Sequence, residues 1–313
     1  MLRFVIRRLL TLIPTLFLAT FVVFGLLQLV PGDPAVVIAG EYATDERINQ
    51  IREQLGLNDP LLVQYWHWVS DAVTGDLGRS LINRSEVTEQ ITRRLPATLT
   101  IVVGALVISA VVGVLLGVLA AARPHSKRDT FLTGLSTMGV AVPNFWLAMV
   151  LVTVFSLQLG WLPATGSVGV TQSPVEAVRH ALLPSIALGA VGAAEMARQV
   201  RSALLGVMHS DFVRTHRAKG LSERRILWIH GLRSAGIPAI TTFGLLVNRF
   251  LGATVVVEAV FGIAGMGSMI VDATFNLDFP VVQGVVLVMV LIVVFINFLV
   301  DVAYRWIDPR VTF

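Results

Sequence analysis

Residues 211–225 read DFVRTHRAKGLSERR, a polar and basic stretch between two apolar runs. Asp211 can accept hydrogen bonds from the free N–H groups at a helix start, and Gly220 suits the left-handed residue that follows a helix end. Ser222 can cap a second helix that continues through residues 226–229. The stretch therefore predicts a short helix, a glycine turn and another helix, outside the bilayer and between two membrane spans. It either binds a partner protein or is a solvated basic loop held on the cytoplasmic side by its charge.

The composition indicates a membrane protein. Of the 313 residues, 55% are hydrophobic and 14% are charged, which is more apolar surface than a water-soluble domain needs. Cysteine is absent, so disulfides, thiolate metal sites and a cysteine nucleophile are excluded. Lys and Arg cluster beside apolar runs without interleaved aromatic residues, which indicates a cytoplasmic membrane face rather than a nucleic-acid partner.

The apolar runs predict an all-α membrane protein. The six expected spans are residues 9–30, 97–122, 131–159, 181–197, 237–261 and 281–303. The first run has 22 residues against about 7–15 in a cleaved signal peptide, so residues 1–30 are interpreted as a retained N-terminal membrane helix. Residues 31–96 form an extracytoplasmic loop, 198–236 a cytoplasmic loop and 304–313 a cytoplasmic tail. Residues 262–280 are glycine-rich and are expected to be re-entrant or to lie on the surface.

The distribution of basic residues sets the orientation. The N-terminus, the 123–130 loop, the 198–236 loop and the tail hold 16 Lys and Arg residues, and the opposite side holds 7. Both termini are therefore expected in the cytoplasm. Within the spans, the spacing of Gly113 and Gly117 allows two helices to approach closely, and Pro143 predicts a kink because proline removes a backbone donor.

Four polar residues fall inside or at the ends of the apolar runs: Glu195, Asn248, Arg249 and Glu258. Ionisable groups in a membrane pair with each other or face water, so they mark a pathway or a partner contact. We expect Glu195 to pair with Arg198 one turn away. Asn248, Arg249 and Glu258 are candidates for lining a pore or contacting a partner subunit.

No enzyme or metal site emerges from the sequence. There is no G-x-x-x-x-G-K-[ST] phosphate loop, no H-E-x-x-H and no G-x-S-x-G motif, and the six histidines are scattered. The chain is therefore expected to bind no cofactor itself. An ion-coupled secondary transporter that uses Glu195 or Glu258 remains an alternative, although such transporters are commonly larger and built from paired repeats.

Short motifs in a fixed order carry a resemblance over essentially the whole chain. They are RLL (8–10), VPGDPA (30–35), LGLNDPL (55–61), GDLG (75–78), RLPATL (94–99), PNFWL (143–147), WLP (161–163), VEAVFGIAGMG (257–267) and DFPVVQG (278–284). Together with residues 211–225 they resemble the membrane subunits of ATP-binding-cassette importers, in the dipeptide, oligopeptide and nickel family, and the first of the two permeases in such systems. The chain departs from the wider pattern where Arg214, Thr215 and His216 replace Glu-Ala-Ala, and from the family at Ala264 and Leu277.

The resemblance implies the type I importer architecture, with a core of five helices over residues 97–303. It implies half of a translocation pore in a bacterial cytoplasmic membrane, a second homologous permease, two ATPases that bind ATP and Mg, and an extracytoplasmic substrate-binding protein. The residues expected to dock onto the ATPases are Asp211, Phe212, Val213, Arg214, Thr215, Arg217, Ala218, Gly220 and Leu221. Dipeptides or oligopeptides are the expected cargo, with nickel, glutathione and haem as alternatives within the same family.

Overall fold

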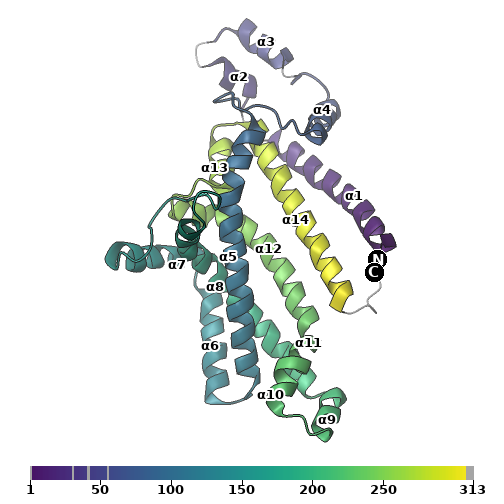
Figure 1. Ribbon diagram of the computed structural model, residues 1–313. Helices are drawn as coiled ribbons and strands as arrows, with labels where there is room; N and C mark the ends of the chain where they lie inside the picture. Colours follow the sequence, from purple (N-terminus) through teal and green to yellow (C-terminus); the bar gives the residue numbers. More distant parts are fainter. Residues whose placement is uncertain (1, 30–31, 41–42, 55, 308–313) are drawn as a thin grey trace. The chain divides into compact units, whose positions relative to one another are not determined.

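The computed structural model describes residues 2–29, 32–40, 43–54 and 56–307. The helices are α1 (Leu2–Leu27), α2 (Pro34–Ala39), α3 (Asp45–Gln54), α4 (Leu61–Thr74), α5 (Val87–Ala121), α6 (Lys127–Ala141), α7 (Asn144–Leu151), the π-helical segment η1 (Val152–Gln158), α8 (Pro174–Met208), α9 (Asp211–Ala218), α10 (Glu223–Arg225), the π-helical segment η2 (Ile226–Gly231), α11 (Leu232–Ser234), α12 (Gly236–Val260), α13 (Met266–Phe275) and α14 (Phe279–Ile307) (Figure 1). Over the described residues the only extended pairing is one isolated bridge between Arg79 and Glu86.

The expected membrane spans can be followed one by one. Among the described residues, five helices are long and apolar enough to cross a membrane, namely those containing residues 10–27, 87–121, 174–208, 236–260 and 279–304. The pair formed by α6 and the α7–η1 segment supplies a sixth if it is counted as one span. The chain is therefore an all-α membrane protein, as its composition predicts.

The expected span 131–159 is broken rather than kinked. Its two halves meet at an angle of 98°. Helix α6 ends at Ala141, Val142 adopts an extended conformation, and Pro143 precedes the first residue of α7. A proline ring disfavours the helical conformation of the residue before it, so the change of direction falls at Val142.

Two membrane helices extend beyond the predicted runs. Helix α5 begins at Val87 and contains Pro96, ten residues before the expected start. Helix α8 spans 35 residues and contains Pro184, whereas its apolar run covers only 181–197. In both helices the extra turns carry polar residues, because a helix that leaves the bilayer no longer needs an apolar surface. The motif positions 30, 31 and 55, and residues 308–313 of the expected tail, lie outside the described residues.

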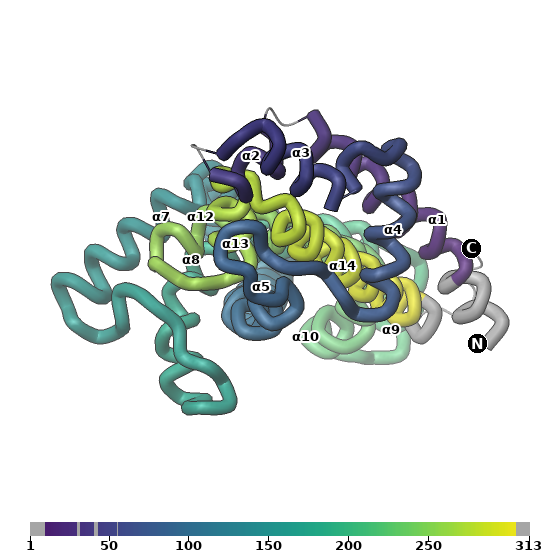
Figure 2. The backbone as a smooth tube through the Cα atoms, turned by 90° about the horizontal axis from the view of Figure 1, so that it is seen from above, coloured from purple at the N-terminus to yellow at the C-terminus, as the bar shows by residue number. Residues whose placement is uncertain are grey.

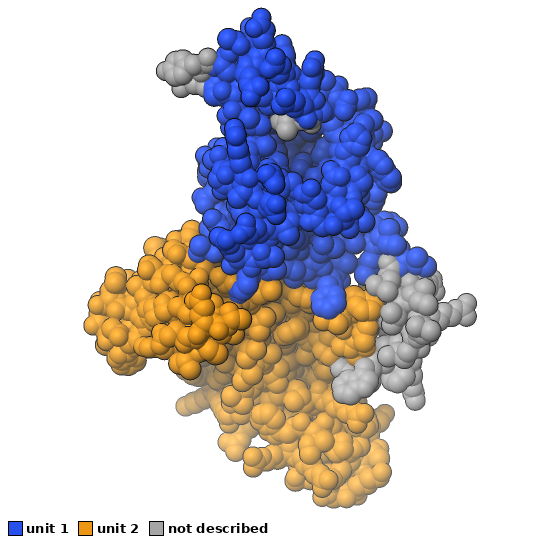
Figure 3. Space-filling model, turned by 45° about the horizontal axis from the view of Figure 1, so that its top comes forward, with its two compact units in different colours: residues 1–96, 264–295 blue, residues 97–263, 296–313 orange. Residues whose placement is uncertain are grey.

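Two compact units divide the chain: residues 1–96 with 264–295, and residues 97–263 with 296–313 (Figure 3). In the first unit, α4 packs on α1 through Tyr65, which is 2% exposed. Its ring contacts Phe17, Phe21 and Phe24 edge-on, and its hydroxyl lies 2.8 Å from the hydroxyl of Thr20. Edge-to-face contacts and a satisfied hydroxyl are favourable for a buried tyrosine, so this cluster joins the first loop to the first span.

A second apolar cluster of the first unit joins the start of α5 to α13 and α14. Val87 and Ile91 pack with Met266, Met269 and Val285, and α13 lies beside the first turns of α14 (Figure 2). Asp278 accepts hydrogen bonds from the Ser80 hydroxyl and from the Leu81 N–H. The glycine-rich segment predicted to be re-entrant or surface-lying thus contains a packed ten-residue helix.

Close packing of α5 against α8 organises the second unit. A Cβ on Gly113 would lie 2.6 Å from the Met196 Cβ, and one on Gly117 would lie 2.7 Å from the Ala197 carbonyl oxygen. On α8, Gly189 approaches the carbonyl oxygen of Ala105 in the same way. The spacing of Gly113 and Gly117 correctly predicted a close helix approach, because only residues without a side chain fit between the two backbones.

Candidate functional site

The basic stretch forms a helical element that directly follows α8. Helix α9 is followed by Gly220 in the left-handed conformation, with φ of +77°, and the Ser222 side chain accepts a hydrogen bond from the N–H of Arg225. The helix, glycine turn and second cap were therefore predicted correctly. The first cap was not, because Ser210 is the N-cap residue and Asp211 is the first residue of α9. Serine and aspartate are about equally good N-caps, so the sequence alone could not choose between neighbours.

The exposed face of α9 carries most of the residues predicted to dock onto a partner. Asp211, Phe212, Arg214, Thr215, Arg217, Ala218 and Gly220 are exposed, and Leu221 is half-buried. Val213 differs from the prediction, because its side chain is fully buried within this chain and cannot contact a partner. Phe212, Trp228 and Ile229 are exposed large apolar residues of the same element. Apolar groups beside charged ones at a protruding surface are typical of a protein–protein contact.

An ion pair closes the turn between α9 and α10. The Arg217 guanidinium donates from Nε to Glu223 Oε1 at 2.6 Å and from the second nitrogen to Oε2 at 3.1 Å. The hydrogen bond from Arg217 holds the pKa of Glu223 below its usual value, and the same bond raises the pKa of Arg217. Two parallel bonds fix the direction of a guanidinium as well as its position. The pair therefore fixes the conformation of the turn that contains Gly220.

Three rings pack together where α9 meets η2. The His216 ring centroid lies 4.3 Å from that of Phe212 and 4.3 Å from that of His230. Burial lowers the pKa of His230, and the positive charges of His216 and Arg225 lower it further. The cluster packs α9 against η2, so the two halves of the basic stretch form one structural element.

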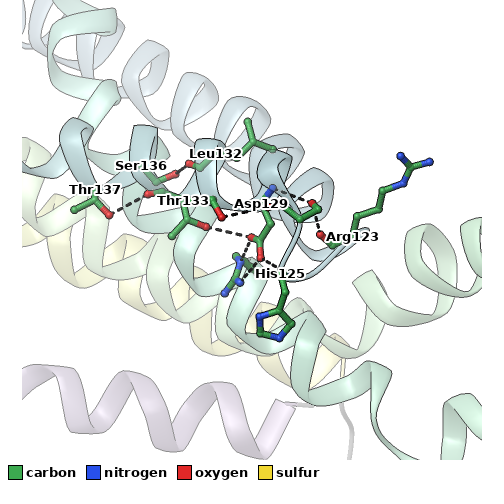
Figure 4. A network of polar contacts seen from close by, with 10 residues as sticks. Arg123, His125, Asp129, Leu132, Thr133, Ser136 and Thr137 are labelled. Atoms are coloured by element: carbon green, nitrogen blue, oxygen red, sulfur yellow. Dashed lines mark hydrogen bonds and ion pairs between the residues drawn. The ribbon is translucent and has the colours of Figure 1, made fainter.

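A polar network connects α6 to α8 just before that element begins. Asp129, which is 4% exposed, accepts two hydrogen bonds from the Arg201 guanidinium, at 2.6 and 2.7 Å. Its oxygens also accept from the His125 N–H and the Thr133 hydroxyl, and the network continues along α6 through Ser136 and Thr137 (Figure 4). This pair was not predicted from the sequence. The signal available was a lone aspartate within the basic loop 123–130.

The intramembrane charges pair across helices rather than along one. Glu195 of α8 accepts a hydrogen bond from Arg249 of α12, so the expected local pair of Glu195 with Arg198 is wrong. Asn248 and the Arg249 side chain are exposed on the surface of the second unit. Glu258 differs from the expectation of a pore or partner contact, because its side chain is fully buried and accepts a hydrogen bond of 2.6 Å from Thr98 of α5.

The first unit contains a hollow of about 670 Å³. Its apolar wall includes Phe24, Trp68 and Phe279, and its charged lining includes the ion pair of Arg52 with Asp33. Although burial raises the pKa of Asp33, hydrogen bonds from Arg52 and from the Ala35 N–H lower it below its usual value.

Within the described part of the chain, no group of three or more His, Asp or Glu residues is placed to hold a metal ion.

Comparisons with known proteins agree with this arrangement. Residues 113–313 match the family described as "Binding-protein-dependent transport system inner membrane component", and residues 1–102 match its N-terminal counterpart. The chain is 41% identical to the glutathione transport system permease protein GsiC of Escherichia coli K12, and 40% identical to that of Shigella boydii serotype 4, over 313 residues and the full length of both proteins in each case. Its fold is similar to a chain of the MetNI methionine ABC transporter in an inward-facing conformation, with a TM-score of 0.56 and 19% identity over 70% of this chain and 96% of that one.

The apolar segments and the family match together define a multi-pass transport permease of the cytoplasmic membrane. The chain belongs to the family of binding-protein-dependent transport system inner membrane components. It is therefore the membrane-spanning permease subunit of an importer, of the class that the resemblance to the dipeptide, oligopeptide and nickel branch predicts.

Proposed function

We propose that this chain forms one half of the translocation pore of an ATP-driven importer for peptide-type cargo, with α9 as its contact to an ATPase. The observation that carries the proposal is the α9 element itself. A short rigid helix with exposed Phe212 and Arg214 follows a membrane helix directly, and the Arg217–Glu223 pair closes its turn. A solvated loop would need neither this closure nor exposed apolar side chains.

The partners follow from the class of transporter. A second, homologous permease completes the pore, two ATPases bind ATP and Mg, and a substrate-binding protein delivers cargo on the opposite side. Two polar residues within the spans support an exposed pathway face on this chain, because Asn248 and Arg249 lie on the surface of the second unit. Glu258 is not part of that face.

A continuous connection from membrane to docking element supports the mechanism. Helix α8 runs without interruption to Met208, and α9 begins three residues later. The Asp129–Arg201 pair joins α8 to α6 near that end, so a displacement of α9 moves more than one helix. ATP can drive the switch between inward and outward access only if the ATPases bind α9 differently in the two states.

The cargo is proposed to be a dipeptide or short oligopeptide, and glutathione, itself a tripeptide, is the member of that class that the relatives favour. The supporting observation is 41% identity to permeases of glutathione transport systems, spread over the whole of both chains. Peptides and glutathione share free carboxylate and ammonium groups, so one pathway chemistry suits both.

Co-purification with a matched control tests the proposal. Phe212→Ala on α9 is expected to abolish recovery of the ATPases with the tagged permease from native membranes. Phe145→Ala on α7 removes a phenylalanine of similar exposure, 44% against 46% for Phe212, outside the docking element and is expected to leave that recovery unchanged. Cargo uptake into proteoliposomes should require ATP. Uptake by the chain alone, driven by an ion gradient, would instead establish the secondary-transporter alternative.

A further inference from the structure

One face of α12 is exposed from Thr241 to Ala259. Its members recur every three or four residues: Thr241, Leu245, Asn248, Gly252, Val256 and Ala259. That spacing places them on a single side of an α-helix. Asn248 and the adjacent Arg249 lie on or beside this face, whereas Val247 and Phe250 are buried. The face therefore carries a polar patch within an apolar span.

The polar patch lies within the expected spans, at the middle of α12 and two residues before the end of the apolar run 181–197 of α8. Arg249 comes 13 residues after Gly236 and 11 residues before Val260, at the middle of α12. Glu195 comes 13 residues before Met208 at the end of α8, so the two partners lie roughly 20 Å from the matching ends of their helices. A half-exposed guanidinium within an apolar span is costly when it faces hydrocarbon. The face must instead meet water or another protein surface.

The pairing leaves binding capacity unused. A guanidinium has five N–H donors, and one hydrogen bond, from a terminal nitrogen to Glu195, is recorded for Arg249 among the described residues. The Arg249 side chain is 56% exposed and that of Glu195 is 21% exposed. The pair thus presents donors for an anion beside an acceptor for a cation. The Asn248 amide can donate a hydrogen bond to an anion or accept one from a cation.

We infer that Arg249, Glu195 and Asn248 form a site in the translocation pathway for the charged termini of a zwitterionic, peptide-type cargo. Arg249 binds the carboxylate, and Glu195 faces the ammonium group. Because Arg249 is already partly neutralised by Glu195, it holds a passing carboxylate weakly, and weak binding is what a conducting pathway requires. The inference rests on the proposed function and adds the residues and the charge pattern that contact the cargo.

The absence of cysteine from the chain allows a local test in the assembled importer. Asn248→Cys introduces the only thiol of this subunit, and its reaction rates with a sulfonate-bearing and a trimethylammonium-bearing methanethiosulfonate are followed by the mass of this subunit. Val247→Cys, one residue away but buried, is the matched control. We expect Asn248→Cys to react with both charged reagents and Val247→Cys with neither.

Charge variants then identify the group that attracts anions. In the Asn248→Cys background, Arg249→Gln should lower the ratio of anionic to cationic labelling rates about tenfold, equivalent to about 1.4 kcal/mol. Glu195→Gln should raise the same ratio, because it leaves Arg249 without its counter-charge. Trialanine should slow labelling more than trialanine amide does, since the amide lacks the terminal carboxylate.

Three results would overturn the inference: no labelling of Asn248→Cys, a rate ratio that neither charge variant changes, or no protection by trialanine. If the second permease alone protects Asn248→Cys from labelling, without any cargo, the face is an interface between permeases. Binding-protein-stimulated ATP hydrolysis is measured on the same preparations. If that activity is intact and the labelling results fail, the site is wrong while the importer function stands. If it is absent, the proposed function fails first.

Discussion

Gly113 and Gly117 offer the most direct test of how α5 and α8 are packed. An alanine Cβ at position 113 would lie 2.6 Å from the Met196 Cβ and 2.7 Å from the Ala193 carbonyl oxygen. Because carbon atoms in contact are about 3.5 Å apart, α8 would have to move by roughly 0.9 Å. A clash with a backbone oxygen cannot be relieved by a side-chain rotation. Gly113→Ala is therefore expected to destabilise the fold.

The magnitude combines two opposing effects. Overpacking of this kind costs about 1–3 kcal/mol, while replacing glycine by alanine within a helix gains about 0.8–1 kcal/mol. For each of Gly113→Ala and Gly117→Ala we expect a net loss of roughly 0–2 kcal/mol relative to the wild type, and of about 1–3 kcal/mol relative to a glycine-to-alanine change without a clash. The double variant should lose less than the sum, because one displacement of α8 relieves both clashes.

Equilibrium unfolding in mixed micelles, titrated with sodium dodecyl sulfate, measures these differences. Gly206→Ala is the matched control, since it lies in α8 with nothing within 4 Å of the added Cβ and should be neutral or slightly stabilising. If Gly113→Ala and Gly117→Ala unfold at the same midpoint as Gly206→Ala, the two helices are not in backbone contact and the packing described here is wrong.

Three further predictions concern the docking side of the molecule. Arg201→Ala leaves the buried Asp129 unpaired and should cost about 3–5 kcal/mol of unfolding free energy in the same titration, and an unchanged midpoint would mean that the pair contributes nothing. Gly220→Ala should cost about 1–2 kcal/mol of unfolding free energy because φ at this position is +77°, a conformation that alanine disfavours. Nothing lies within 4 Å of the new Cβ, so no clash contributes. The variant should also lower the recovery of the ATPases, and Gly220→Asn should restore part of that recovery. The lowered pKa of Glu223 means that its pairing with Arg217 stabilises the turn above the usual glutamate pKa and is lost as the pH falls through the lowered value. As the pH falls through that range, the hydrogen-exchange rate of residues 217–223, corrected for its intrinsic pH dependence, should increase in the wild type. It should not increase in Glu223→Gln.

Local patterns in the sequence predicted the elements of this fold well. Apolar runs located the spans because a lipid-facing helix must be apolar, and the glycines at 113 and 117 predicted a contact whose partner they could not name. Helix ends were predicted less well. The cytoplasmic loop was expected to begin at Arg198, yet α8 continues to Met208, since charged residues end a membrane span without ending a helix.

Tertiary pairing was beyond what the sequence could reveal. Glu195 has Arg198 within reach on its own helix, and only the packing of α8 against α12 brings Arg249 closer. Asp129 and Arg201 are 72 residues apart, and no local spacing links them. Burial had the same limit. Val213 and Glu258 looked available in the sequence, and the fold covers both.

The 35-residue length of α8 also restricts which insertions and deletions this subunit can accept in evolution. At about 1.5 Å per residue the helix is roughly 50 Å long, against a hydrocarbon core of about 30 Å. Each residue inserted or deleted between the bilayer and Met208 would rotate α9 by about 100° about the helix axis. A single deletion there should harm ATPase coupling more than most substitutions, whereas an insertion of seven residues, close to two full turns, would keep α9 facing the same way. The number of residues in α8 thus sets the direction in which α9 points.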